Sequence, residues 1–485
     1  MHVEGGSFVG GGRVAGRGET IELIDPATGE VCAVYADAGA EVVGLAAERA
    51  AAGAVAWRAL TAAERGRRLW ALGESVRAAV EDLARIEAVN VGKPLADARA
   101  EALKVAEMFA YYAGWCDKIT GAVLPVPTSH HVHTAKVPFG VVACILPWNA
   151  PLFTAGWNAA PALAAGNAVM LKPSELTPSS ALALARLALE AGLPEGVLQV
   201  VNGLGATTGA ALIRHEVVRK VTFVGSRVTG RRIAALAAEA PKPCVLELGG
   251  KSANIVFADA DLEKAVGGAA AAIFSGAGQS CVAGSRLLVE RSVHDEVVER
   301  LAALAQTIRV GAPLAEGTQV GPIQNARQFE QVRAMVGAAG AAGCGFAAGG
   351  TALEGAGFFF APTVVTGAAN DMAIAQEEVF GPVVAVIPFA SEAEALTIAN
   401  ATAFGLAGAV WTQDPGRALR VVRALEAGTL WVNSYKAISV MAPFGGFKAS
   451  GYGRSSGAEG LEEYVQTKSV WIETAAAPAF SFGYG

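Results

Sequence analysis

The stretch VVACILPWN at residues 141–149 decides the fold that this sequence predicts. A short apolar run ends abruptly at Pro-Trp-Asn, which is the pattern of a strand buried on both faces and closed by a turn. Three similar runs, each ending in turn or cap residues, lie at 168–171, 197–201 and 221–224. Helix-like segments such as 179–191 separate them. This part of the chain therefore predicts a parallel sheet with crossover helices, whose carboxyl edge is where ligands collect.

The same pattern restarts after residue 250. Predicted strands lie at 254–257, 286–290 and 429–432, and a long amphipathic helix lies at 294–308. A chain of 485 residues is also too long for one ordinary core. We therefore expect an α/β fold with two doubly wound parallel-sheet domains.

Two strand-like pieces fit neither sheet. They lie at 126–137 and 464–472, and as edge strands in search of partners they indicate a small β element that forms an oligomer contact. The expected assembly is a homodimer or a homotetramer. The tail at 475–485 carries three aromatic residues. The sequence leaves two interpretations of it open, a tail without a role and a cap on the mouth of a binding tunnel.

Composition argues against several classes of function. The net charge of −6 and the lack of any run of like charges speak against nucleic-acid and membrane partners, so a small molecule is the expected partner. Six cysteines without a Cys-x-x-Cys pair speak against a disulfide framework and a zinc site. We interpret His130, His131 and His133 as part of a solvated strand, and no metal is expected.

Two further stretches bear on where the protein resides. Residues 1–18 are rich in glycine and lack the apolar core of a signal peptide, so a cytoplasmic protein is expected. The uncharged stretch 334–353 is long enough on paper to cross a bilayer, but it is mostly alanine and glycine. We interpret it as a helix end followed by a loop.

Cys281 and Glu247 are the residues with the clearest chemistry. Cys281 ends the stretch Gly-Gln-Ser-Cys, downstream of Glu-Leu-Gly-Gly-Lys at 247–251. A thiol is a useful nucleophile only as thiolate, and a carboxylate can serve as the general base beside it. The other five cysteines are interpreted as small buried apolar residues.

A phosphate-binding turn is predicted at Gly225 and Ser226, between a strand and a helix. Free backbone N–H groups at a helix start, together with a hydroxyl, suit a pyrophosphate. An ordinary helix cap explains these two residues equally well when they are taken alone. The glycine-rich stretch 202–209 resembles a dinucleotide fingerprint, but its final spacing is wrong.

Seven motifs together resemble the aldehyde dehydrogenase superfamily, in order and spacing, from about residue 20 to residue 472. They are PWN at 147–149, KPSE at 172–175, GS at 225–226, ELGGK at 247–251, GQSC at 278–281, EEVFGP at 377–382 and PFGG at 443–446. The resemblance implies an enzyme that oxidises an aldehyde to the carboxylic acid. NAD is the expected cofactor and NADP the alternative.

The resemblance assigns catalytic roles to three residues. Cys281 would attack the aldehyde carbon, while the Asn149 amide and the Cys281 backbone N–H would hold the oxyanion. Glu247 would activate the water that hydrolyses the resulting thioester. That role requires a carboxylate whose pKa is raised.

The resemblance also implies binding residues. Those expected for the cofactor are Ile145, Trp148, Lys172, Glu175, Gly225, Ser226, Leu248, Glu378 and Phe380. Among them, Lys172 and Glu175 would hold the adenosine ribose, and Glu378 would hold the nicotinamide ribose. The expected substrate tunnel is lined by Thr154, Trp157, Phe274, Ile438 and Met441. Such a lining favours an apolar aliphatic or aromatic aldehyde.

Four residues depart from the pattern of the family. Gly276 stands where an asparagine is frequent, and Ser455 stands where many members carry a glutamate that helps to move water or protons. Val224 removes a hydroxyl near the nicotinamide, and Arg227 adds a cation near the phosphates. The sequence leaves the effect of these changes open.

Two alternatives to a hydrolytic dehydrogenase are weighed. A CoA-acylating aldehyde dehydrogenase is disfavoured by Glu247, because such relatives generally lack this base. A non-catalytic member of the fold is disfavoured by the intact set of Cys281, Glu247 and Asn149.

The resemblance also divides the chain into three parts. We expect a Rossmann-like cofactor-binding domain at 1–119 and 139–248, a catalytic domain at 249–450, and oligomerisation strands with a C-terminal tail at 120–138 and 451–485.

Overall fold

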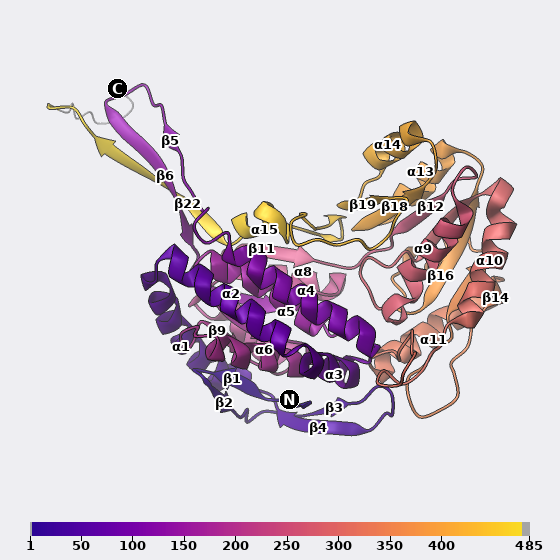
Figure 1. The fold of residues 1–485 in the computed structure, drawn as a ribbon, viewed down its shortest axis with the longest axis horizontal. Helices are drawn as coiled ribbons and strands as arrows, with labels where there is room; N and C mark the ends of the chain where they lie inside the picture. Colours follow the sequence, from indigo (N-terminus) through magenta and orange to yellow (C-terminus); the bar gives the residue numbers. More distant parts are fainter. Residues whose placement is uncertain (1, 478–485) are drawn as a thin grey trace.

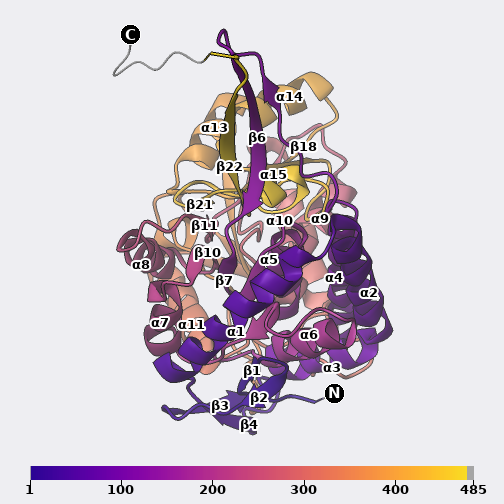
Figure 2. The ribbon, with the colours of Figure 1, turned by 90° about the vertical axis from the view of Figure 1, so that its left-hand side faces the viewer.

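The structure, a computed structural model, describes residues 2–477. Two lobes are each built around their own sheet, and a long β arm projects from the first lobe (Figure 1). The side view shows the arm standing above the helices of that lobe (Figure 2). The sheets confirm the expected fold class, two α/β domains with a small β element. The predicted role of the aromatic tail falls largely on residues outside those described.

The first sheet has a parallel centre in the order β9-β8-β7-β10-β11. Strands β8 and β9 follow β7 along the chain and lie on one side of it, whereas β10 and β11, which come next in the chain, lie on its other side. The topological switch point therefore lies between β7 and β10, where ligands of such sheets bind. The bounds are β7 (Val141–Ile145), β8 (Ala168–Lys172), β9 (Leu198–Val200), β10 (Val218–Val224) and β11 (Cys244–Glu247), with antiparallel edge strands β1 (Ser7–Val9), β2 (Gly12–Val14) and β21 (Gly451–Tyr452).

Both faces of this sheet are buried, which explains the unbroken apolar runs in the sequence. Val142 and Cys144 pack into one cluster, whereas Val141 and Ala143 pack into the cluster on the opposite face. The helices of this lobe are α1 (Gly39–Ala59), α2 (Ala62–Ala78), α3 (Val80–Val91), α4 (Leu95–Ala113), α5 (Pro151–Ala164), α6 (Ser179–Glu190), α7 (Ala210–Arg214) and α8 (Arg227–Ala238), and a hairpin of β3 (Thr20–Ile24) and β4 (Val31–Ala36) lies beside them.

The second sheet has the order β14-β15-β16-β13-β12-β18-β19, parallel except for its β14 edge. Its strands are β12 (Ala253–Val256), β13 (Arg286–Glu290), β14 (Gly345–Ala348), β15 (Thr363–Thr366), β16 (Val383–Phe389), β18 (Ala407–Trp411) and β19 (Thr429–Val432). The main helices around it are α9 (Leu262–Phe274), α10 (His294–Thr307), α11 (Ala326–Ala341), α12 (Ala373–Gln376), α13 (Glu392–Asn400) and α14 (Pro415–Ala424).

The predicted boundary between residues 248 and 249 falls between β11 and β12, which belong to different sheets. Strand β21 nevertheless returns to pair with β11. The segment 451–485 therefore contributes to the first lobe as well as to the arm. The division into domains stays a prediction.

The arm consists of β5 (Val123–Leu124), β6 (His130–Pro138) and β22 (Val465–Glu473). The two strands expected to seek partners pair with each other within the chain, from Val465 opposite Pro138 to Glu473 opposite His130. Strand β6 begins later than predicted, because the preceding segment contains two prolines, which cannot donate to a ladder. The outer edge of β22 is left unpaired in the described chain.

The stretch 334–353 contains a helix end, as expected, but the part after it includes a strand as well as a loop. Helix α11 ends at Ala341, and strand β14 then occupies Gly345–Ala348. Among the described residues no helix is both long enough and apolar enough to span a bilayer.

Candidate active site

One cavity of about 1000 Å³ lies at the carboxyl edge of the first sheet and is lined by residues of both lobes. Most of the residues predicted from the sequence lie along it. Parallel strands end at one edge of a sheet, so residues far apart in the sequence meet there. The predicted residues that line the cavity are Ile145, Trp148, Asn149, Thr154, Trp157, Lys172, Glu175, Gly225, Ser226, Glu247, Leu248, Cys281, Glu378, Phe380 and Ile438.

Phe274 and Met441 do not line this cavity, and their place in the substrate tunnel stays a prediction. Phe274 is the last residue of α9 and is buried in the core of the second lobe, whereas the following residue, Ser275, lines the cavity. Met441 is 67% exposed to solvent. Its loop presents Val440 to the cavity, and the next side chain faces outward.

The loop before Cys281 has a left-handed backbone. Gly276 has a φ of +65°, Ala277 of +55° and Gly278 of +68°. Glycine and asparagine adopt this region more readily than other residues. The glycine that departs from the family pattern at 276 therefore suits the same backbone as the asparagine. A side chain at Gly278 would collide with the Gly381 carbonyl, 1.9 Å from an added Cβ.

Gln279 ties this loop to its surroundings. Its side-chain nitrogen donates to the carbonyls of Gly276 at 3.2 Å and Pro322 at 3.3 Å, and its side-chain oxygen accepts from the Gln324 backbone at 2.8 Å. Asn149 Nδ2 donates to the backbone carbonyl of Gln279 at 2.9 Å. This bond uses one of the two amide hydrogens of Asn149, so the second hydrogen is not engaged by it.

The Cys281 thiol has a strongly raised pKa in this structure. Burial is the largest cause, followed by the carboxylates of Glu378 and Glu247, and together they raise the pKa of the thiol to about 12. The thiol is therefore protonated at neutral pH. A nucleophile in this state needs a base, and Glu247 lines the same cavity.

Glu247 ends β11 and is 5% exposed. Burial raises its pKa to about 8, while a hydrogen bond from Ser455 and the charge of Arg454 act in the opposite direction. Ser455 Oγ donates to Oε1 of Glu247 at 3.0 Å. Within the described chain, Oε2 has no hydrogen-bond partner. A carboxyl group that titrates near neutral pH can both accept and release a proton.

The switch point between β7 and β10 has features that suit a dinucleotide. Ser226 caps α8 by accepting from the Thr229 N–H at 3.3 Å, and both residues line the cavity. The positive end of the α8 dipole therefore faces the cavity. At the end of β8, Lys172 Nζ lies 3.7 Å from the Glu175 carboxylate. Burial lowers the pKa of Lys172.

Glu378 is held against the turn that follows Glu247. The Gly250 N–H donates to Oε1 of Glu378 at 3.0 Å, and a Cβ added to Gly249 would lie 2.2 Å from Oε2. Burial raises the pKa of Glu378 to about 7. Trp148 and Phe380 also line this cavity and meet edge to face, with ring centroids 5.2 Å apart.

A sequence model of the Aldehyde dehydrogenase family matches residues 14–470. The chain belongs to the aldehyde dehydrogenase family. It is 44% identical over 463 residues to betaine aldehyde dehydrogenase of Mesorhizobium japonicum, with 94% of this chain and 95% of the relative covered. It is 43% identical to phenylacetaldehyde dehydrogenase of Pseudomonas fluorescens, with 94% and 93% covered.

Solved structures agree with this assignment. PnpE from Pseudomonas sp. WBC-3 superposes with a TM-score of 0.97 at 43% identity, over 99% of this chain and 100% of that chain. A crystal structure of PnpE in complex with nicotinamide adenine dinucleotide superposes with a TM-score of 0.96 over 98% of both chains. The family and the enzyme class predicted from the sequence, an aldehyde dehydrogenase, are confirmed.

This aldehyde dehydrogenase has cavity residues that the sequence analysis did not single out. Phe153 and Phe444 both line the cavity, with ring centroids 5.0 Å and 5.7 Å from Trp157. Phe153 precedes Trp157 by one helical turn on α5, a spacing that could have revealed it. Phe444 lies within the PFGG motif, so its position could have been inferred from the resemblance.

Charged residues of the dehydrogenase also line the cavity without any motif to mark them. Lys436 is half-buried, has a φ of +57°, and its pKa is lowered by burial to about 8. Lys93 bridges the buried Glu87, at 2.9 Å, and Glu101. These contacts depend on the packing of α3 against α4, so sequence spacing gave no signal.

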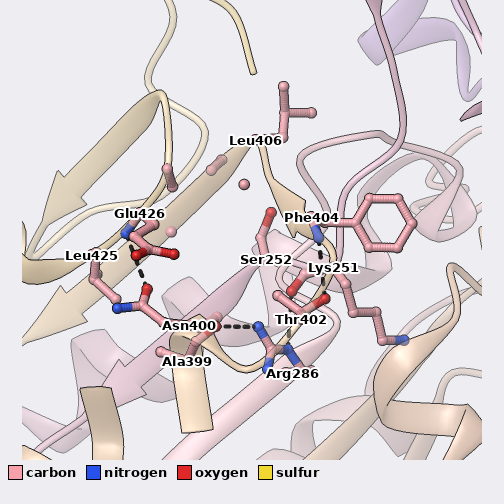
Figure 3. Close-up of a pocket in the computed structure, with 15 residues that line it drawn as sticks. Lys251, Ser252, Arg286, Ala399, Asn400, Thr402, Phe404, Leu406, Leu425 and Glu426 are labelled. Carbon is pink, nitrogen blue, oxygen red and sulfur yellow. Dashed lines mark hydrogen bonds between the residues drawn. The ribbon is translucent and has the colours of Figure 1, made fainter. Parts of the chain in front are cut away.

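A second cavity lies within the second lobe and shares no lining residue with the first (Figure 3). Its volume of about 20 Å³ leaves room for little more than a water molecule. Arg286 donates to the Ala399 carbonyl there at 2.7 Å, while the Lys251 side chain points away from the other labelled residues (Figure 3). This cavity is too small for an aldehyde or a nucleotide.

Proposed function

We propose that this protein oxidises aldehydes to carboxylic acids with NAD, through a thioester on Cys281 that water hydrolyses. One observation carries the proposal: Cys281, Asn149 and Glu247 line a single cavity together with the residues expected to hold a dinucleotide. The names of the relatives support an aldehyde as the substrate.

In the first half of the reaction, Glu247 takes the proton of the Cys281 thiol. The sulfur then forms a bond to the aldehyde carbon. The carbonyl oxygen becomes an oxyanion, which the free N–H of the Asn149 amide and the backbone N–H of Cys281 stabilise. NAD, when bound, supplies the acceptor for the hydride that leaves this carbon, and the product on the enzyme is a thioester.

Before the second half, Glu247 releases the thiol proton to solvent. The ionised carboxylate then accepts a proton from a water molecule as the water attacks the thioester carbon. The carbon–sulfur bond breaks, the acid leaves, and Glu247 returns its proton to the sulfur, which regenerates the thiol. A base for this step should titrate close to the working pH. The raised pKa of Glu247, about 8, is consistent with that requirement.

The residues at the switch point fit a dinucleotide. The α8 N-terminus offers N–H groups and a positive dipole to a pyrophosphate. The carboxylate of Glu175 can accept hydrogen bonds from ribose hydroxyls and would repel a 2′-phosphate, so we propose NAD rather than NADP as the preferred cofactor. Lys172 lies beside this carboxylate and softens the preference.

We propose an apolar aliphatic or aromatic aldehyde as the substrate. Support comes from the aromatic group of Phe153, Trp157 and Phe444, with Ile438 and Val440 on the same cavity. Aromatic rings supply large apolar contact areas for such substrates. Rates measured over a series of aldehydes of increasing chain length would test this, and a preference for short, charged aldehydes would contradict it.

We propose that the arm makes the contact of a homodimer or of a tetramer built from dimers. The unpaired edge of β22 can add a strand of a second copy, and Trp471, 57% exposed, lies on this strand. Light scattering that finds only monomer at micromolar concentration would contradict this.

The six free cysteines also agree with a reducing cytoplasm as the location we propose.

Two variants test the catalytic assignment. Cys281→Ala should abolish NADH formation and leave NAD binding intact, which titration of the protein with NAD can measure. Glu247→Gln should still form thioester once the thiol is ionised at high pH, and should therefore show one burst of NADH followed by slow turnover. A Cys281→Ala protein that oxidises aldehydes at the rate of the unmodified enzyme would overturn the mechanism.

A further inference from the structure

Ser455 touches the side chain that we propose as the general base. Its hydroxyl donates to Oε1 of Glu247 at 3.0 Å, and both residues are buried. Oε2 of the same carboxyl group has no partner among the described residues, although Glu247 lines the cavity. The two oxygens of one carboxyl group are therefore in different situations: Oε1 is bound to Ser455, and Oε2 is buried without a partner among the described residues.

The backbone of Ser455 is fixed from both sides. Its N–H donates to the Phe444 carbonyl at 2.8 Å, and the Phe444 N–H donates back to the Ser455 carbonyl at 2.7 Å. The next residue, Ser456, has a φ of +63° and immediately precedes α15 (Gly457–Glu462). On the other side, Glu247 is fixed by its pairing with Gly451 in β21. Neither partner can shift far without breaking backbone hydrogen bonds.

We propose that Ser455 is a positioning residue for the general base: its hydroxyl holds Oε1 of Glu247 and leaves Oε2 to take the proton of the attacking water. This inference rests on the proposed function, in which Glu247 is that base. It also gives Ser455 a role that differs from that of the glutamate frequent at this position in the family. A neutral hydroxyl donates a hydrogen bond to the base, whereas a second carboxylate would repel it.

The charges that act on Glu247 allow this contact to be tested by pH. Arg454 favours the ionised form of Glu247, and Glu463 opposes it. Glu463 is in turn paired with Lys220 at 2.7 Å. The Cys281 thiol faces the same cavity and stays neutral below its raised pKa. None of these charges changes when the Ser455 hydroxyl is removed, so a shift in the titration of Glu247 reports the lost hydrogen bond.

Removal of the hydroxyl should make the base harder to ionise. A hydrogen bond to a charged group corresponds to about one to two pKa units. The pH at which deacylation reaches half its maximal rate should therefore rise by about one unit or more. At pH 7 deacylation should slow about tenfold, because the ionised fraction of a base falls tenfold for each unit below its pKa.

The experiment uses the full-length enzyme with Ser455→Ala, and a matched pair of Ser455→Thr and Ser455→Val. Threonine and valine have nearly the same shape, so any packing cost is shared and only the hydroxyl differs. Ser456→Ala is the control, since it removes a neighbouring hydroxyl that has no hydrogen bond to Glu247 within the described structure. Rapid-mixing traces from pH 6 to 10 separate the first turnover of NADH from the steady rate that follows.

Support for the proposal is a rise in the deacylation midpoint for the alanine and valine variants, with the threonine and Ser456→Ala variants unchanged. An unchanged midpoint in the valine variant overturns it, as does an equal shift in threonine and valine. The Glu247→Gln variant shows whether the Ser455 proposal alone has failed or whether the proposed function has failed as well. If Glu247→Gln deacylates as fast as the unmodified enzyme, Glu247 is not the base and the mechanism itself fails. If it does not, and the valine midpoint is unchanged, only the role of Ser455 fails.

Discussion

The reactivity of Cys281 in the enzyme without cofactor offers the most quantitative test of the site. The perturbation is a change of pH in the presence of a small aromatic disulfide such as dithiodipyridine, which reacts with thiolates. Burial and the carboxylates of Glu378 and Glu247 raise the pKa of this thiol to about 12. The side chain lines an open cavity of about 1000 Å³, so the reagent can reach it.

The expected magnitude follows from two opposing effects. At pH 8, a thiol with a pKa of about 12 is ionised in roughly one molecule in 10⁴, against about a quarter for an ordinary cysteine. Each thiolate is more nucleophilic by about 0.4–0.5 logarithmic units per pKa unit, which recovers a factor of about 25–55. The smaller ionised fraction outweighs the higher nucleophilicity of each thiolate. Cys281 should therefore react about 40- to 100-fold more slowly than free cysteine.

The assay follows the absorbance of the released thiopyridone from pH 7 to 10, and Cys281→Ala supplies the signal of the other five cysteines. The rate at Cys281 should rise about tenfold for each pH unit over this range. Glu378→Gln should accelerate the reaction at pH 8, because the Glu378 carboxylate is the largest source of negative charge acting on the thiol. A rate that levels off between pH 7 and 9 would refute the reasoning, since the thiol would then titrate within that interval.

Three further predictions concern the oxyanion site, the cofactor and stability. Asn149→Ala should slow the NADH burst about 100-fold, because loss of one oxyanion donor typically costs about 3 kcal/mol; a burst of unchanged rate would exclude this role. Glu175→Gln should raise kcat/KM with NADP relative to NAD, and an unchanged ratio of the two would count against the ribose contact. The folded-state pKa of Glu247, about 8, lies above its ordinary value of 4.5. Between these two pH values the folded chain holds a proton on Glu247 that the unfolded chain has lost, so the folded state loses stability as the pH rises from 4.5 to about 8. The Tm of Glu247→Gln minus that of the unmodified enzyme should therefore grow from pH 5 to 8 and level off above it, and a pH-independent difference in calorimetry would contradict this.

The parallel sheets were predictable from the sequence because their strands are buried on both faces. Such strands appear as unbroken apolar runs, and β13 and β19 coincide with the predicted ranges 286–290 and 429–432. The strand at 126–137 was placed less well. Its backbone pairing with β22 joins segments more than 300 positions apart, and local sequence carries no signal of such a contact.

The candidate site was likewise predictable in part from the sequence and in part only from the structure. Motif residues such as Asn149 and Cys281 were found from sequence, and the structure brings them to one cavity. Phe274 does not line the cavity whereas Ser275 does, because the end of α9 determines which of the two positions faces it. The effect of Ser455 was left open, because its hydrogen bond to Glu247 spans 208 positions of sequence.

By itself, the sequence determined the chemistry of this protein: a thiol, a carboxylate and an amide in recognisable motifs, together with two sets of buried strands. Only the tertiary structure decided how that chemistry is tuned. The pKa of Glu247 depends on its burial and on the Ser455 hydroxyl. The pKa of Cys281 depends on its burial and on two carboxylates that are distant in the sequence but line the same cavity. Desolvation and charge act through space, whereas sequence motifs record only the order of residues along the chain.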